Sequence, residues 1–311
     1  YLERMIERAR HVEVQILGDK FGDIYHLYER DCSVQRRNQK VVERAPAPYL
    51  TEAQRAEICA LGKKICAHVN YECAGTVEFL MDMDSQEFYF IEVNPRVQVE
   101  HTVTEEVTGI DIVRAQILIA EGKPLAEATG TGCQDDVRLD GHAIQCRVTT
   151  EDPSNNFIPD YGRITAYRGA TGMGIRLDGG TAYSGAVITR YYDSLLEKVT
   201  AWAPTPEAAI ARMDRALREF RIRGVSTNIA FVENLLKHPT FLNYEYTTSF
   251  IDTTADLFKF SKRRDRATKI LTYIADITVN GHPETQDRAR PAGDIKPPKV
   301  PVALGDRAEG T

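Results

Sequence analysis

Residues 76–100 of the 311-residue chain read TVEFLMDMDSQEFYFIEVNPRVQVE and predict an antiparallel β-hairpin. Two β-prone runs, 76–82 and 88–93, flank a polar turn centred on Ser85. Positions equidistant from Ser85 face each other, which places Glu78 opposite Glu92. Carboxylates directly opposite on a sheet repel, so the pair needs a compensating charge such as Mg²⁺, which takes one or two carboxylates together with substrate phosphates. Two solvated glutamates on an exposed face are the alternative.

From position 91 to 100, polar residues occupy every even position and apolar residues or proline every odd position. In an extended chain the even positions form one row: Glu92, Asn94, Arg96, Gln98 and Glu100. A plain solvent face alternates in the same way, but Pro95 favours an edge or a loop over a central strand. Arg96 is suited to clamp a planar oxyanion with two parallel hydrogen bonds, and Glu100 to remove a proton from the bound species. The row therefore indicates activation of a small acid.

A basic segment supplies three cations and three amides within six residues: Gln35, Arg36, Arg37, Asn38, Gln39 and Lys40. A polyphosphate site needs both charges and neutral hydrogen-bonding groups, whereas an exposed basic loop is the alternative. The segment has no aromatic residue, which disfavours base stacking with a nucleic acid. Arg147 is the remaining candidate. On a strand it shares a face with Gln145 and Thr149, and a structural salt bridge is its alternative role.

The rest of the chain mixes helices with antiparallel strands, so the predicted fold class is α+β. His11, Glu13 and Gln15 alternate with apolar residues, which predicts a strand over 10–17 with one buried face. Thr51 is suited to cap a helix that runs to about residue 69. Further strands are predicted over 24–29, 141–150, 162–168, 173–178 and 196–202, and further helices over 111–121, 206–221, 228–237 and 266–277.

The composition excludes several classes of protein. The chain has 39 Lys and Arg against 45 Asp and Glu, a net charge of −6 and no dominant basic stretch, so a nucleic-acid partner is not expected. It lacks the run of roughly 18 apolar residues that a transmembrane helix needs, so no membrane partner is expected. The six cysteines form no CxxC pair, which indicates reduced thiols. Because the first residues are charged and the sequence does not begin with Met, we expect a piece of a longer protein.

Several separated motifs resemble the biotin carboxylase component of the biotin-dependent carboxylases, an ATP-grasp family. They are Arg10-His11-Val12-Glu13, residues 33–40 running into Ala45-Pro46-Ala47-Pro48, residues 90–101, and Cys146-Arg147-Val148. The resemblance covers about residues 1–250. Within the family it is strongest to the pyruvate carboxylase branch, through NFIPDYGRI at 156–164, RATKILTY at 266–273 and VNGHP at 279–283.

The resemblance implies a division of the chain into three parts. Residues 1–122 would be the C-terminal part of the ATP-grasp domain and 123–252 the biotin carboxylase C-terminal domain. Residues 253–311 would form a helix and an extended linker toward allosteric and carboxyltransferase parts. The glycine-rich phosphate loop and nucleotide-binding lysines of the family belong upstream of residue 1. We therefore expect the 311 residues alone to be nearly inactive.

The resemblance also implies an activity, the carboxylation of biotin by ATP and bicarbonate through carboxyphosphate, as the first half of the conversion of pyruvate to oxaloacetate. Glu78 and Glu92, assisted by Asn94, would hold Mg²⁺ or Mn²⁺. The nucleotide would contact Glu3, Ile6, His11, Gln35 and Asn38, although other branches have His where Asn38 stands. Bicarbonate would be positioned by Lys40, Arg96, Gln98 and Val99. Glu100 would deprotonate bicarbonate, and Arg147 would bind biotin and stabilise its enolate.

The implied partners are a biotin carboxyl carrier and a carboxyltransferase in the same longer polypeptide, and further copies of that polypeptide in a tetramer. The implied location is the bacterial cytoplasm, or the mitochondrial matrix in a eukaryote. Two alternatives stay open. One is the biotin carboxylase part of an acyl-CoA carboxylase, and the other is a mainly structural or allosteric segment that packs on a partner through Ile270, Leu271 and Ile274.

Overall fold

The computed structural model describes residues 4–180, 182–260 and 266–282. The chain divides into two units, Tyr1–Phe260 and Ser261–Thr311. The predictions for Glu3 and for the linker after residue 282 fall outside the described residues. Within those residues, no helix is both long enough and apolar enough to cross a membrane.

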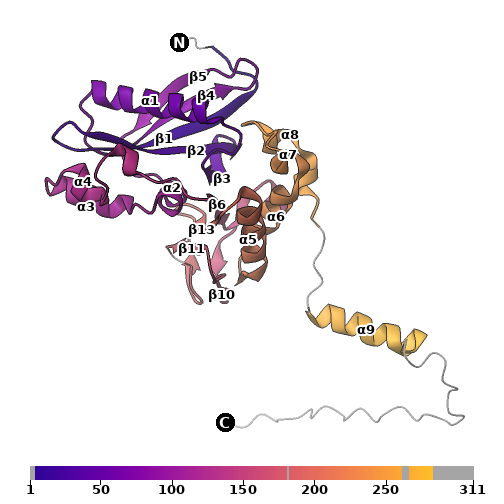
Figure 1. Cartoon of the computed structure of the whole chain (residues 1–311). Helices are drawn as coiled ribbons and strands as arrows, with labels where there is room; N and C mark the ends of the chain where they lie inside the picture. Colours follow the sequence, from indigo (N-terminus) through magenta and orange to yellow (C-terminus); the bar gives the residue numbers. More distant parts are fainter. Residues whose placement is uncertain (1–3, 181, 261–265, 283–311) are drawn as a thin grey trace, which may run out of the picture. The chain divides into compact units, whose positions relative to one another are not determined.

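An eight-stranded antiparallel sheet organises the first unit, in the order β11-β13-β6-β3-β2-β1-β4-β5 (Figure 1). Its strands are β1 Ala9–Gly18, β2 Ile24–Arg36, β3 Gln39–Ala45, β4 Cys73–Asp82, β5 Phe88–Asn94, β6 His142–Thr149, β11 Ile175–Gly179 and β13 Leu195–Ala203. The pairing of β3 with β6 joins the first five strands to the later three. One continuous sheet therefore brings early and late parts of the sequence together.

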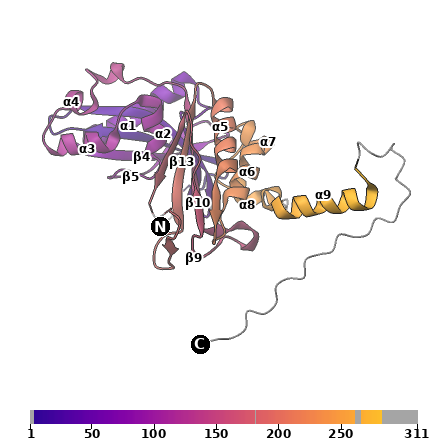
Figure 2. The ribbon, with the colours of Figure 1, turned by 90° about the horizontal axis from the view of Figure 1, so that it is seen from below.

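Helices cover both faces of the β1–β5 region, with α1 on one side and α2–α4 on the other (Figure 1). α5 and α6 lie beside the β6–β13 part of the sheet (Figures 1 and 2). The bounds are α1 Glu52–His68, α2 His101–Thr108, α3 Ile112–Ala120, α4 Leu125–Thr129, α5 Pro206–Glu219, α6 Ile229–Lys237, α7 Pro239–Leu242 and α8 Phe250–Thr253. The described part of the second unit holds α9, Arg266–Asn280.

Short elements complete the first unit. The two-stranded ribbons are built from β7 Glu151–Asp152 with β8 Ile158–Pro159, β9 Gly162–Arg163 with β12 Val187–Ile188, and β10 Ala166–Arg168 with β14 Arg221–Arg223. The 3-10 helices are η1 Gln134–Asp136, η2 Pro153–Asn155 and η3 Ala255–Phe258.

Thr51 begins α1 as predicted. Its hydroxyl accepts from the Gln54 backbone N–H, and the Gln54 side chain accepts from the Thr51 backbone N–H, so two backbone donors at the helix start are satisfied. Cys59 and Cys66 lie on the buried face of this helix. The capping residue was thus sufficient to predict where this helix begins.

The prediction of a single buried face for residues 10–17 is wrong, because every residue of β1 is buried. The apolar face packs on α1 through Val12 and Val14. The polar face is also buried, since Arg30 bonds Glu13 on this strand and Thr104 on α2. Burial of a polar strand face is stable only with such partners.

The extended row predicted for residues 91–100 ends at Asn94, where β5 stops. The chain turns at once, with the backbone N–H of Arg96 donating to the Asn94 carbonyl at 2.9 Å. α2, which the sequence did not predict, begins at His101. The proline between Asn94 and Arg96 prevents the strand from continuing, because it offers no backbone donor.

The basic segment forms the turn of a β-hairpin and the strand ends beside it. β2 continues to Arg36 and β3 begins at Gln39, which leaves a two-residue turn. Both turn residues, Arg37 and Asn38, have positive φ, at 50° and 62°. Primed turns of this kind match the twist of a hairpin, and Asn tolerates the conformation well.

An aromatic cluster supports the C-terminal part of the first unit. Phe231 on α6 is fully buried, 4.9 Å from the Phe157 ring and 5.4 Å from the Phe258 ring. We expect Phe231→Ala to lower the free energy of unfolding by about 3–5 kcal/mol, because it leaves a cavity. Chemical denaturation measures the change, and Phe21→Ala, whose side chain is 61% exposed, is the control. Equal destabilisation by both variants would contradict this packing.

Candidate active site

Most of the predicted site residues line a cavity of about 410 Å³. They reach it from β1, the β2–β3 hairpin, β4, β5, β6 and the turn before α2. The predicted residues in its lining are His11, Asn38, Lys40, Glu78, Glu92, Asn94, Arg96, Gln98, Val99, Glu100 and Arg147. The cavity is therefore the candidate site.

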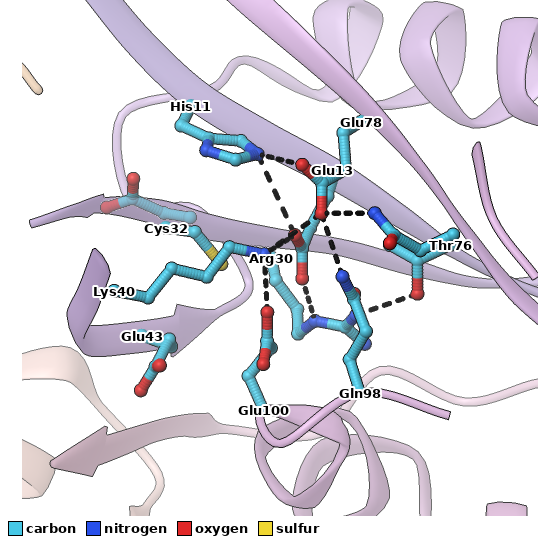
Figure 3. Close-up of polar contacts among 12 residues, drawn as sticks. His11, Glu13, Arg30, Cys32, Lys40, Glu43, Thr76, Glu78, Gln98 and Glu100 are labelled. Atoms are coloured by element: carbon cyan, nitrogen blue, oxygen red, sulfur yellow. Dashed lines mark hydrogen bonds and ion pairs between the residues drawn. The ribbon is translucent and has the colours of Figure 1, made fainter. Parts of the chain in front are cut away.

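Lys40 lies at the centre of the charged side chains in this cavity (Figure 3). Its Nζ donates to Glu13 Oε2 at 2.6 Å, to Glu78 Oε1 at 3.1 Å and to a carboxylate oxygen of Glu100. Burial disfavours the charged amine, but the neighbouring carboxylates outweigh burial and raise the pKa of Lys40 well above its ordinary value. Lys40 thus remains a cation at the meeting point of three acids.

The pairing of Glu78 with Glu92 across β4 and β5 confirms the predicted register. Asn94 Nδ2 donates to Oε1 of both residues at 3.0 Å, so the two carboxylates converge on one position. Burial raises the pKa of Glu78, but the hydrogen bond from His11 and the charge of Lys40 hold it well below its usual range. Convergent carboxylate oxygens are the donor set that Mg²⁺ and Mn²⁺ prefer, so these residues fit such an ion.

A second group of potential metal ligands lies deeper. The ligand atoms of His11, Glu13 and Glu78 fall within 4.8 Å of one another. Lys40 already donates to both carboxylates of this group. The ammonium group thus supplies the positive charge here, and Glu78 Oε1, which accepts from Lys40, also accepts from Asn94 Nδ2.

Glu13 and Arg30 form a buried pair that sequence reasoning missed. Arg30 Nε donates to Glu13 Oε1 at 2.6 Å, and neither side chain is exposed. Burial raises the pKa of Glu13, but Lys40 and Arg30 lower it to about 2. The other guanidinium nitrogens of Arg30 donate to Gln15, Thr104, Thr76 and Gln98. Because Gln98 in turn donates to Glu78, this pair supports the floor of the cavity.

Arg147 reaches the cavity from β6. Its Nη2 donates to Glu100 Oε2 at 3.1 Å and its Nε to Glu43 Oε1 at 2.6 Å. Burial lowers the pKa of Arg147, but the two carboxylates raise it above its ordinary value. The predicted salt bridge is therefore confirmed, and it places Arg147 beside the candidate base Glu100.

Two family models match the chain. The Carbamoyl-phosphate synthase L chain, ATP binding domain, matches residues 1–128, and the Biotin carboxylase C-terminal domain matches residues 145–253. The pyruvate carboxylase of Bacillus subtilis is 55% identical over 313 residues, which cover 100% of this chain and 27% of that protein. The chain belongs to the pyruvate carboxylase family. It corresponds to the biotin carboxylase region and spans about a quarter of the length of the curated relatives it matches.

Solved structures of the family agree with this fold. The complete multifunctional pyruvate carboxylase of Rhizobium etli matches with a TM-score of 0.83 and 69% identity over 94% of this chain and 29% of that one. The biotin carboxylase domain of the Hydrogenobacter thermophilus 2-oxoglutarate carboxylase, solved with MgADP, ADP and bicarbonate, matches with a TM-score of 0.80 and 43% identity, covering 84% and 56%. The α+β fold, part of an ATP-grasp domain followed by a biotin carboxylase C-terminal domain, is confirmed.

The remaining candidates lie less closely together. Gln35 Nε2 contacts His11 Nδ1 at 2.6 Å and donates to the Cys32 carbonyl, so Gln35 lies behind His11. Arg96 is exposed on the rim, with Nη2 donating to Asn94 Oδ1 at 3.4 Å. Ile6 is half-buried outside the cavity lining. The roles of these residues stay predictions.

Proposed function

We propose that this chain is the biotin carboxylase part of a complete pyruvate carboxylase. Biotin would be carboxylated with ATP and bicarbonate, and a carboxyltransferase elsewhere in the polypeptide would pass the carboxyl group to pyruvate, giving oxaloacetate. The observation that carries the proposal is the position of Glu100. The residue is 2% exposed, and its carboxylate bonds both Lys40 and Arg147 and is linked through Lys40 to Glu78.

The metal-binding end of the cavity would hold the ATP phosphates. A bound Mg²⁺ or Mn²⁺ supplies positive charge to the transferring phosphoryl group. Glu78 and Glu92, with Asn94 between them, would hold that ion from adjacent strands. His11, Gln35 and Asn38 would contact the nucleotide. MgADP bound to the Hydrogenobacter thermophilus domain supports this assignment.

The centre of the cavity would bind and activate bicarbonate. Lys40 and Arg96 would hold its oxygens, together with the Gln98 side chain and the backbone at Val99. Glu100 would accept its proton, and the resulting anion would attack the γ-phosphorus of ATP, releasing ADP and forming carboxyphosphate. Lys40 would offset part of the repulsion between the anion and the neighbouring carboxylates, because its ammonium group lies within hydrogen-bond distance of three of them.

Arg147 would act in the second step. Carboxyphosphate would break to CO₂ and phosphate, and the phosphate would take the proton from the ureido nitrogen of biotin. That nitrogen would then attack CO₂ while Arg147 stabilises the negative charge on the ureido oxygen, because a fixed cation is worth most in a site screened from water. Biotin would be brought by a carrier in the same longer polypeptide. That polypeptide would work as a tetramer.

The three proposed parts of the chain stay 1–122, 123–252 and 253–311. Leu257 is fully buried in the core of the first unit, so a truncation that tests the third part should begin after Phe260. Relatives include bacterial proteins and the human mitochondrial pyruvate carboxylase. We accordingly propose the bacterial cytoplasm, or the mitochondrial matrix in a eukaryote, as the location.

Phosphate release from ATP tests this proposal. With Mg²⁺, the complete polypeptide is expected to require bicarbonate and to be stimulated by free biotin, whereas residues 1–311 alone should be nearly inactive. Robust biotin-stimulated release by the isolated 311 residues would contradict the proposed division of the ATP site. Oxaloacetate formation from pyruvate, measured beside acetyl-CoA carboxylation, separates this function from that of an acyl-CoA carboxylase.

A further inference from the structure

Glu43 is a buried carboxylate for which the proposed reaction has no role. It lies on β3, its side chain is completely buried, and the β3–β6 register pairs it with Gln145. Arg147, two residues further along β6, is its diagonal neighbour. Glu43 Oε1 accepts from Arg147 Nε at 2.6 Å, and Oε2 accepts from Gln145 Nε2 at 3.0 Å. Both carboxylate oxygens are thus used, one of them on the guanidinium.

The guanidinium of Arg147 bonds two acids, each through a different nitrogen. Nε faces Glu43, away from solvent, while Nη2 faces Glu100 in the cavity at 3.1 Å. The side chain of Arg147 keeps 21% of its surface exposed, whereas that of Glu43 keeps none. A guanidinium is planar and rigid, so fixing Nε also fixes the direction in which the Nη atoms point.

The backbone beneath Arg147 is held separately. Asn228 Nδ2 donates to the Arg147 carbonyl at 2.8 Å, and Asn228 Oδ1 accepts from the Thr149 backbone N–H at 2.9 Å. Asn228 therefore replaces the hydrogen bonds of a neighbouring strand at this point of β6. With the main chain fixed, the freedom that remains to Arg147 is rotation of its side chain, and the bond to Glu43 restricts it.

We propose that Glu43 is the positioning residue for Arg147. It holds Nε while Nη2 passes from Glu100 to the ureido oxygen of biotin. The inference rests on the proposed function and adds a residue to it. When Glu100 has accepted the bicarbonate proton it loses its negative charge and its hold on Nη2 weakens, whereas the bond between Glu43 and Nε is retained. Arg147 then points toward biotin, and only its contact with Glu100 has to break.

The test uses the complete carboxylase and four variants: Glu43→Gln, Arg147→Ala, the double variant, and Glu29→Gln as the control. Glu29 is an equally buried carboxylate that accepts from Arg55 Nε at 2.9 Å, and it is absent from the cavity lining among the described residues. The readouts are phosphate release with and without free biotin, and thermal melting. Biotin stimulation is expected to fall by about 10–100-fold in Glu43→Gln, as for other residues that orient a functional side chain, and to persist in Glu29→Gln.

The double variant decides whether Glu43 acts through Arg147. If it does, Glu43→Gln lowers the biotin-stimulated rate in the wild-type background and leaves the rate of Arg147→Ala unchanged. The same fold-loss in both backgrounds, or wild-type stimulation in Glu43→Gln, would overturn the proposal. A wild-type enzyme that biotin does not stimulate would instead contradict the proposed function.

Melting tests the same pairing without any need for activity. Arg147→Ala leaves Glu43 as a buried carboxylate without its cation, so adding Glu43→Gln to that variant should raise its melting temperature. In the wild-type background, Glu43→Gln should lower the melting temperature. A further decrease in the double variant would show that Glu43 is stabilised by groups other than Arg147, and the proposal would fail.

Discussion

Replacing Glu100 with Gln in the complete carboxylase is expected to lower bicarbonate-dependent ATP cleavage by about 10²–10⁴-fold, the usual contribution of a general base. Gln has the size of Glu and can still accept a hydrogen bond from Lys40, but it cannot take a proton from bicarbonate. Lys40 and Arg147 hold the Glu100 carboxylate from two sides of the cavity. The loss should therefore reflect chemistry more than a rearranged site.

Steady-state phosphate release at saturating ATP measures this effect. Glu106→Gln is a matched control, since Glu106 is half-buried on the helix that Glu100 precedes and is absent from the cavity lining among the described residues. That variant should keep its bicarbonate dependence. Near-normal bicarbonate-dependent cleavage by Glu100→Gln would mean that another group removes the proton, and the central assignment would be wrong.

Replacing Arg147 with Ala is expected to lower the biotin-stimulated rate by about 10²–10³-fold, the cost of removing a preorganised donor to a developing oxyanion. Cleavage of ATP without biotin should fall much less, because Glu100 and Lys40 remain. The difference between the two rates identifies the step in which Arg147 acts. An equal loss in both would place it at bicarbonate and not at biotin.

The control for Arg147→Ala is Arg215→Ala. Arg215 is an exposed arginine of α5 that pairs with Glu219 on the same helix, outside the described cavity lining. Exposed pairs of this type contribute little to stability, so the variant should behave like the wild type. A similar loss of biotin stimulation in both arginine variants would show that the effect of Arg147 is not specific to the site.

Local patterns were enough to predict the parts of the fold that depend on neighbouring residues. The turn centred on Ser85 determined which positions of β4 and β5 pair, so the amino-acid sequence alone was sufficient to place Glu78 opposite Glu92. Thr51 determined the start of α1 in the same way. Both features depend on contacts within a short stretch of chain, which sequence patterns record directly.

The buried partners of the site depend on contacts that local patterns do not record. Glu13 was seen as one polar residue of an alternating strand and as part of a family motif, but nothing nearby marks Arg30 as its partner. Glu43 lies in the sequence far from Arg147, which it reaches only because β3 pairs with β6. The alternation at 91–100 grouped side chains that line one cavity, but the extended strand behind that prediction ends at Asn94, and a turn carries Arg96 to the rim.

The most direct test of the proposed function follows the carbon atom of bicarbonate. Carbon-14-labelled bicarbonate, ATP, Mg²⁺ and free biotin are incubated with the complete polypeptide, and the label on biotin is compared with the phosphate released. We expect ATP-dependent labelling of biotin, in step with biotin-stimulated phosphate release and lost in Arg147→Ala. Bicarbonate-dependent phosphate release that leaves biotin unlabelled would contradict the proposed function, and would assign this cavity to a different acceptor.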